Sequence, residues 1–199
     1  MKRQTVNSKF FNTEAQLPYA LRLKDFELAM QDVYDFLFDV NNMLLDKGLH
    51  RFDDMLRAAA LSGMFSDMLT ASLAKHARGL VENTHPNGHP DLVRRGHYAN
   101  NAVIAGEHGI EIKSTKNSGG AVDTHGARNE WMCVFIWSID QDSQPAAKRE
   151  PTRFTTIYLA EVVVADFRNN ARGPLGTRTS TLHAAGLKKL RANCIYQEI

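Results

Sequence analysis

The sequence contains little cysteine and no long apolar segment, and both shortages limit the classes of protein to which it can belong. Only two of the 199 residues are cysteines, Cys133 and Cys194, too few for the disulfide framework of a small secreted domain. No apolar stretch approaches the roughly 18–20 residues that a helix needs to cross a bilayer. The N-terminus is basic, but no apolar segment of a signal peptide follows Lys2 and Arg3. We therefore expect a protein of the reducing cytoplasm, without membrane contacts.

Net charge is also small, at +2, but the charges are unevenly distributed. Residues 1–112 contain 12 Lys and Arg against 14 Asp and Glu, whereas residues 113–199 contain 12 against 8. A basic C-terminal half is compatible with binding along a phosphate backbone. An ordinary solvated surface has the same composition, so charge alone does not select a polyanion as the partner.

A three-to-four residue apolar period predicts two long helices in the first half of the chain. The first covers residues 25–47, where Lys47 and Gly48 supply a basic last turn and a stop signal. The second covers residues 53–78 and ends at Gly79. Residues 1–80 are thus expected to be mainly helical, and their Met and Phe side chains to serve as core or as a dimer interface. A further short helix is expected over residues 181–191.

The apolar period changes after residue 80 and predicts short strands. Residues 131–137 are almost continuously apolar, which is typical of a strand covered on both faces. With 43% hydrophobic residues and no internal repeat, the 199 residues suit one α/β domain. Residues 81–199 are expected to form its sheet core, with candidate strands at residues 92–95, 102–105, 109–114, 131–137, 154–159 and 161–166.

Two carboxylates and a lysine fall in neighbouring strand-like segments. Glu111 and Lys113 are two residues apart and therefore share one face of a strand, while Ile110 and Ile112 enter the core. If the segment that begins at Asp91 pairs with this strand, Asp91 and Glu111 meet at a position where they share a divalent cation. Magnesium suits this arrangement, because it prefers oxygen ligands, takes one or two carboxylates and retains several waters.

The pair Pro90-Asp91, followed by Glu111-Ile112-Lys113, resembles the PD-(D/E)xK nuclease superfamily, best known from type II restriction endonucleases. The resemblance covers about residues 80–140, and the motif is short. It implies a restriction-endonuclease-like fold, a mixed central sheet flanked by helices. It also implies that Asp91 and Glu111 ligate Mg²⁺, with Mn²⁺ as a substitute, and that Lys113 is catalytic.

Two further metal ligands are candidates. The backbone carbonyl of Ile112, between Glu111 and Lys113, is available as an additional oxygen. Many members of the superfamily add an acidic residue from the preceding helix, and Glu82 is the candidate here; a plain surface position for Glu82 is equally open. A competing zinc site at His85 and His89 is disfavoured, since Pro86 and Gly88 prevent the helix that such a pair requires.

The sequence therefore predicts a Mg²⁺-dependent endonuclease that cleaves double-stranded DNA as a homodimer, most plausibly a type II restriction enzyme. A junction resolvase or repair nuclease, and a non-catalytic DNA-binding module of the same fold, are the alternatives. A Gly-rich loop after the catalytic strand and a second basic region supply the candidate DNA contacts; a plain surface loop is the competing interpretation. These candidates are Lys116, His125, Arg128, Asn129, Arg168 and Arg172.

Overall fold

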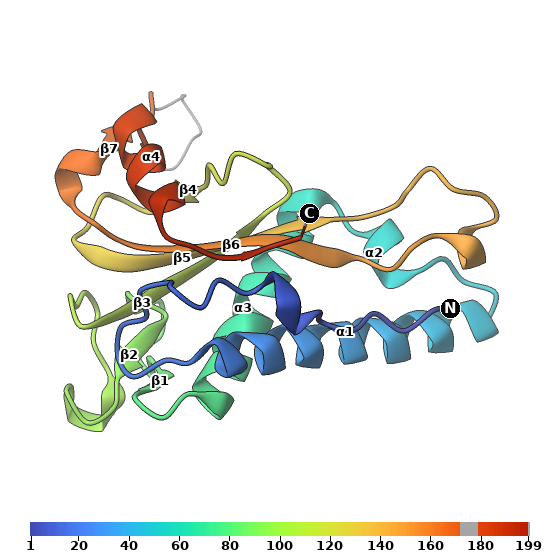
Figure 1. The fold of residues 1–199 in the computed structure, drawn as a ribbon, viewed down its shortest axis with the longest axis horizontal. Coiled ribbons are helices and arrows are strands. Elements are labelled where there is room, and N and C mark those ends of the chain that lie inside the picture. The colour runs from blue at the N-terminus through green and yellow to red at the C-terminus, as the bar shows by residue number, and fades with distance from the viewer. Residues whose placement is uncertain (172–178, 199) are drawn as a thin grey trace.

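The computed structural model describes residues 1–171 and 179–198 and contains a mixed central sheet with helices on both faces (Figure 1). The six strands of this sheet lie in the order β1-β2-β3-β5-β6-β9. They are β1 (Leu80–Glu82), β2 (Leu92–Arg94), β3 (Gly109–Thr115), β5 (Glu130–Ser138), β6 (Arg153–Val162) and β9 (Cys194–Gln197). The expectation of an α/β fold with a mixed central sheet is confirmed.

Four α-helices and a small second sheet complete the fold of the described residues. The small sheet has the order β4-β8-β7, from β4 (Asp123–Thr124), β8 (Ser180–Leu182) and β7 (Phe167–Asn169). The helices are α1 (Leu23–Asp46), α2 (Phe52–Met55), α3 (Ala58–His76) and α4 (Ala184–Ala192). None of the helices in the described part of the chain combines the length and apolarity needed to span a membrane.

Strand β5 is buried on both faces, as its apolar sequence predicts. Its side chains at Cys133, Phe135 and Trp137 join the larger core, which α1 and α3 cover on one side of the sheet. The alternate side chains, including Met132 and Val134, join a smaller core that contains residues of α4 and β8. In Figure 1, α1 lies below strands β5 and β6 and α4 lies above them.

Helix α1 ends where Lys47 and Gly48 predict and begins at Leu23, two residues before the predicted start. At the start, the carboxylate of Asp25 accepts a hydrogen bond of 2.9 Å from the backbone N–H of Arg22, as the third residue of a capping box does. At the end, Gly48 has a φ of +71°, and the N–H of Leu49 donates to the carbonyl of Leu44. This left-handed glycine cap stops the helix.

The prediction of one continuous helix over residues 53–78 is wrong. Leu56 and Arg57 are extended, with ψ values of 142° and 149°, and divide it into α2 and α3. No glycine or proline marks this break. The tertiary contacts of α2 hold it as a separate turn, so an apolar period that continues across the break does not reveal it.

Several strand boundaries also differ from the prediction. Residues 102–105 form only an isolated bridge, at Ala105. Residues 154–159 and 161–166 were predicted as two strands, but the first of them and the start of the second form one strand, β6, which pairs with β5 along almost its whole length. A 3₁₀ turn, Val164–Asp166, follows it. The predicted helix over residues 181–191 begins only at Ala184. Strands β1, β4, β7, β8 and β9 are too short to show an apolar period.

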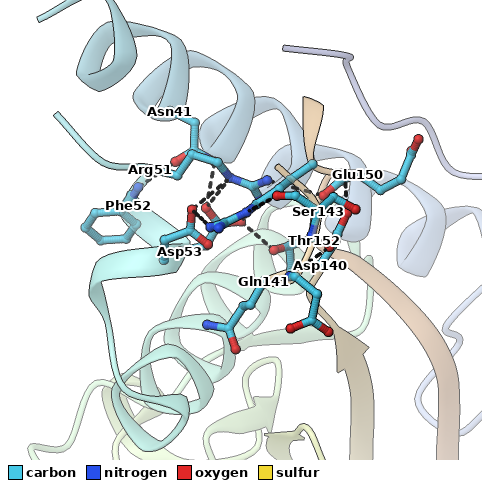
Figure 2. Close-up of polar contacts among 12 residues, drawn as sticks. Asn41, Arg51, Phe52, Asp53, Asp140, Gln141, Ser143, Glu150 and Thr152 are labelled. Carbon is cyan, nitrogen blue, oxygen red and sulfur yellow. Dashed lines mark hydrogen bonds and ion pairs between the residues drawn. The ribbon is translucent and has the colours of Figure 1, made fainter. Parts of the chain in front are cut away.

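A buried ion pair fastens α2 to the loop between β5 and β6 (Figure 2). Arg51 and Asp53 are both fully buried and paired with each other. Asp53 also accepts hydrogen bonds from Asn41 at 3.1 Å and from the hydroxyl of Thr152 at 2.6 Å. The guanidinium of Arg51 donates to the carbonyl of Glu150 at 3.3 Å. These contacts join α1, α2 and the start of β6.

Removing the carboxylate of Asp53 leaves the Arg51 guanidinium buried without its counter-charge. We expect Asp53→Ala to lower the free energy of unfolding by about 3–5 kcal/mol, measured by urea denaturation. Lys2→Met is the control, because the Lys2–Glu150 pair is exposed, with 71% and 62% of the two side chains accessible, and its loss is expected to cost at most about 1 kcal/mol. Equal stability of the two variants would contradict this role.

Candidate active site

The sheet opens at the point where β2 stops pairing with β3. The last antiparallel pair on this side is Leu92 with Ile110. One residue earlier, Asp91 turns its side chain into the gap, and its Oδ2 accepts a hydrogen bond of 2.8 Å from the N–H of Ile112. Gly109 permits the close pairing beside the gap, since a Cβ there would lie 2.0 Å from the Leu92 carbonyl oxygen. A side chain thus replaces the backbone acceptor that the ladder no longer supplies.

Glu111, Lys113 and His89 converge at this opening. The Nζ of Lys113 donates to Oε1 of Glu111 at 2.5 Å, and Nδ1 of His89 lies 3.2 Å from Oε2. One possible ligand atom from each of His89, Asp91 and Glu111 lies within 4.8 Å of the other two. The structure therefore brings together Asp91, Glu111 and Lys113, the three residues that the motif singles out.

The two carboxylates differ in their protonation behaviour. Burial, with the charge of Glu111 added to it, raises the pKa of Asp91 to about 6. Burial also acts to raise the pKa of Glu111, but the hydrogen bond from His89 and the ammonium of Lys113 outweigh it and lower this pKa to about 2. Burial acts to lower the pKa of Lys113, and the charges of Glu111 and Asp91 reverse this and raise it. Lys113 is thus held as a cation against Glu111.

A third buried carboxylate, Glu130, belongs to the same environment and was missed by the sequence analysis. It is the first residue of β5 and is only 2% exposed. Burial, followed by the charge of Glu111, raises its pKa to about 7. Its signal in the sequence is an acidic residue at the start of an almost wholly apolar strand, two residues before Met132 and on the same side of that strand.

The loop before Asp91 is held by Asn83, which the sequence analysis also missed. Its Nδ2 donates to the carbonyls of Pro90 at 3.0 Å and Val103 at 2.9 Å. Its Oδ1 accepts from the N–H groups of His85 and Val103, both at 3.1 Å. The amide thereby joins two loops and fixes the backbone that carries Asp91. An asparagine directly after a short strand gives no distinctive sequence signal for this role.

The opening widens into a cleft with two adjoining hollows of about 700 and 650 Å³. Asp67, Asp91 and His125 line both hollows, so they mark the line where the two meet. Most lining side chains of the larger hollow are polar or charged, unlike the mainly apolar pockets that hold small organic ligands. The cleft suits a charged, hydrated ligand.

The acidic residue that α3 presents to this cleft is Asp67, and not the predicted Glu82. Asp67 is the only acidic residue in α3. Glu82 is exposed and lies on strand β1, after the helix has ended at His76. It lines the larger hollow but lies outside the cluster of His89, Asp91 and Glu111. The expectation that Glu82 comes from the preceding helix is therefore wrong, because the chain has already changed to strand there.

These residues fit a divalent cation. Asp91 and Glu111 offer two carboxylates, the number that Mg²⁺ usually takes from a protein. A strand residue directs its N–H and its carbonyl to the same edge of the strand. The carbonyl of Ile112 therefore points to the edge of β3 where its N–H donates to Asp91. His89 adds an imidazole nitrogen, a ligand better suited to Mn²⁺ and later transition metals than to Mg²⁺. His85, the other half of the alternative zinc pair, directs Nδ1 to the neighbouring Pro86 carbonyl at 2.8 Å.

The predicted DNA-contacting loop reaches the cleft only in part. His125 lines both hollows, and Arg128 donates to the carbonyl of His125 at 2.8 Å. Lys116 is exposed just beyond β3, with Nζ 3.4 Å from Gln141. The Oδ1 of Asn129 accepts from the N–H of Val164 at 3.0 Å. Asn129 therefore already uses the oxygen that a bidentate contact with adenine requires.

The second candidate contact region lies apart from the first. Arg168 is exposed on β7, which pairs with β8, and β8 in turn pairs with β4. Arg168 is thus two strands away from Asp123, which lines the smaller hollow. Arg172 lies outside the described residues.

The raised pKa of Glu130 predicts a stability change with pH in metal-free protein. A carboxyl with a higher pKa in the folded state than in the unfolded chain stabilises the fold when protonated. This contribution is full below about pH 4.5 and is lost as the pH rises through about 7. The rise in the pKa of Glu130 from its ordinary 4.5 to about 7 corresponds to about 3 kcal/mol.

We expect Glu130→Gln to remove most of this dependence, because an amide does not titrate. Urea unfolding in EDTA at pH 5 and pH 8 measures it, with the exposed Glu14→Gln as the control. Glu111 stays charged throughout this range, because its pKa is lowered. Asp91, whose pKa is raised to about 6, also titrates between the two pH values and contributes the dependence that Glu130→Gln retains. A Glu130→Gln protein with the wild-type difference between the two pH values would show that Glu130 does not cause it.

Comparison with known proteins gives no independent assignment of this site. No protein-family model, no curated protein and no solved structure matches the chain. The chemistry of the cleft must therefore be inferred from its own residues.

Proposed function

We propose that this protein is a Mg²⁺-dependent endonuclease that hydrolyses phosphodiester bonds of double-stranded DNA. The observation that carries the proposal is the convergence of Asp91, Glu111 and Lys113 at the opening of the sheet, beside a polar cleft. The order of elements is also the one that the PD-(D/E)xK resemblance implies: helix α3, strand β2 directly after Asp91, strand β3 with Glu111, and then the apolar strand β5.

Each residue has a defined task in this proposal. Asp91, Glu111 and the Ile112 carbonyl hold the cation, and Asp67 on α3 lines the same hollow as Asp91. Bound Mg²⁺ neutralises the phosphate and lowers the pKa of a coordinated water. Lys113, held as a cation by Glu111, orients the attacking water and stabilises the negative charge that develops on the phosphate oxygens. His125, which lines both hollows, and Arg128, which donates to the His125 carbonyl, are the proposed contacts to the backbone of a bound strand.

Sequence-specific cleavage by a type II restriction enzyme is the form of this activity that we favour. Cutting both strands of a duplex requires two such sites, and the described chain supplies one, so the active species is proposed to be a homodimer. The apolar faces of α1 and α3 are largely used in the core. The remaining exposed apolar side chains near the end of α1 and α2 are available as an interface: Phe36, Met43, Leu49 and Met55.

Removing one ligand charge tests the catalytic assignment. Asp91→Asn keeps an oxygen that accepts from the Ile112 N–H, so the fold should persist while Mg²⁺-dependent cleavage of unmethylated phage DNA falls below detection. EDTA should have the same effect on the wild-type protein. Glu14→Gln serves as the matched charge control and should cleave normally. Undiminished cleavage by Asp91→Asn would exclude this residue as a metal ligand.

Lys113 is expected to act on the reaction more than on binding. Lys113→Ala should retain DNA affinity and slow cleavage about 10²–10⁴-fold, the usual contribution of a group that assists proton transfer or charge development. Single-turnover cleavage and a filter-binding assay, both on the same duplex, separate the two effects. Wild-type cleavage by this variant would refute the assignment.

The type of nuclease and its assembly require separate measurements. Discrete plasmid fragments indicate a restriction enzyme, whereas preference for branched DNA indicates a junction resolvase. Binding without any nicking in Mg²⁺ or Mn²⁺ indicates a non-catalytic DNA-binding module. Sedimentation on cognate DNA should show two protein chains per duplex, and a monomer would contradict the dimer.

A further inference from the structure

Glu130 is a buried carboxylate for which the proposed reaction has no use. Its side chain is 2% exposed, and neither carboxylate oxygen has a hydrogen-bond partner among the described residues. Buried carboxylates are almost always hydrogen-bonded or paired with a charge, because removing them from water is costly. Glu130 therefore lacks the donors that its position requires.

The strand register places Glu130 next to the cation site. Strands β3 and β5 are parallel, with Glu111 opposite Met132. Glu130 is two residues before Met132, so its side chain lies on the same face of the sheet as that of Glu111 and diagonal to it. The charges of Glu111, Arg128, Lys113 and His89 all act on Glu130.

The hydrogen bonds of the cationic neighbours go to acceptors other than Glu130. Lys113 donates to Glu111 at 2.5 Å, and Arg128 donates to the carbonyl of His125 at 2.8 Å. His89 directs Nδ1 to Glu111. None of these contacts satisfies Glu130, although all three residues are near enough to influence its charge.

A hydrated cation supplies the missing donors. Magnesium bound by one or two carboxylates retains several waters, and these waters need acceptors. Glu130 is not a member of the group whose ligand atoms lie within 4.8 Å of one another. It is therefore placed to accept from a metal-bound water, and not to ligate the ion together with His89, Asp91 and Glu111.

We propose that Glu130 is a positioning residue that accepts hydrogen bonds from water on a divalent cation held by Asp91 and Glu111. This inference rests on the cation site of the proposed function. It adds a fourth protein group, from β5, that fixes where the coordinated water lies. In the metal-free protein the same carboxylate opposes folding, because its charge is buried without donors.

Metal binding without DNA tests this role directly. We expect Glu130→Gln to weaken Mg²⁺ about 10–100-fold, the usual loss when a group that hydrogen-bonds a metal site is changed, measured by calorimetric titration at pH 8. The same substitution should raise the melting temperature in EDTA, because it removes a buried charge. Glu130→Asp, which keeps the charge, should bind Mg²⁺ more tightly than Glu130→Gln, and Glu14→Gln should match wild type.

The combination of weaker metal binding and higher metal-free stability separates this role from a structural one. A purely structural residue would lower the melting temperature when changed and leave the Mg²⁺ Kd of the folded protein unaltered. If Glu130→Gln does not fold, Glu130→Leu, which fills the buried space without a charge, takes its place with the same expected loss of affinity.

Asp91→Asn separates failure of this inference from failure of the proposed function. If Asp91→Asn loses Mg²⁺ binding while both uncharged Glu130 variants retain the wild-type Kd, the role of Glu130 is wrong and the cation site stands. If Asp91→Asn binds Mg²⁺ as wild type does, the cation site itself is wrong, and this inference falls with the proposed function.

Discussion

Crowding of negative charge at the opening of the central sheet is the constraint on which the site depends. Asp91, Glu111 and Glu130 come together there, and Lys113 is the cation paired directly with one of them. Glu111 is stabilised as an anion, whereas burial raises the pKa of the other two carboxyls. Such an arrangement is unfavourable unless protons or a cation balance it, and the proposed metal ion would supply that balance.

The fold holds this cluster by ordinary sheet geometry. Strand β2 begins to pair with β3 only at Leu92, so the carboxylate of Asp91, one residue earlier, accepts from the N–H of Ile112. The parallel pairing of β3 with β5 sets Glu130 diagonal to Glu111. On the opposite face, α1 and α3 bury the large apolar core. The rigid core therefore supports one edge of the cleft, while the loop fixed by Asn83 supports the other.

Much of the local structure could be predicted because its signals are contained in short stretches of chain. The apolar period and Gly48 define α1, and the alternation at Glu111 and Lys113 puts both side chains on one face. Other features could not be predicted in this way. The break at Leu56 and Arg57 has no local signal, since the buried Arg51–Asp53 pair depends on residues of α1 and β6.

Patterns within single stretches of chain were enough to predict the α/β class, the long first helix and the doubly covered strand β5. They also singled out Asp91, Glu111 and Lys113, on the condition that their two segments pair. Tertiary structure decided that Asp67 and not Glu82 is the acid that α3 presents to the cleft, and that Glu130 belongs beside Glu111. The physical reason is the separation of these residues along the chain. Periodicity and spacing indicate which side chains share a face within one helix or strand, whereas strand order and register bring together residues that share no local pattern.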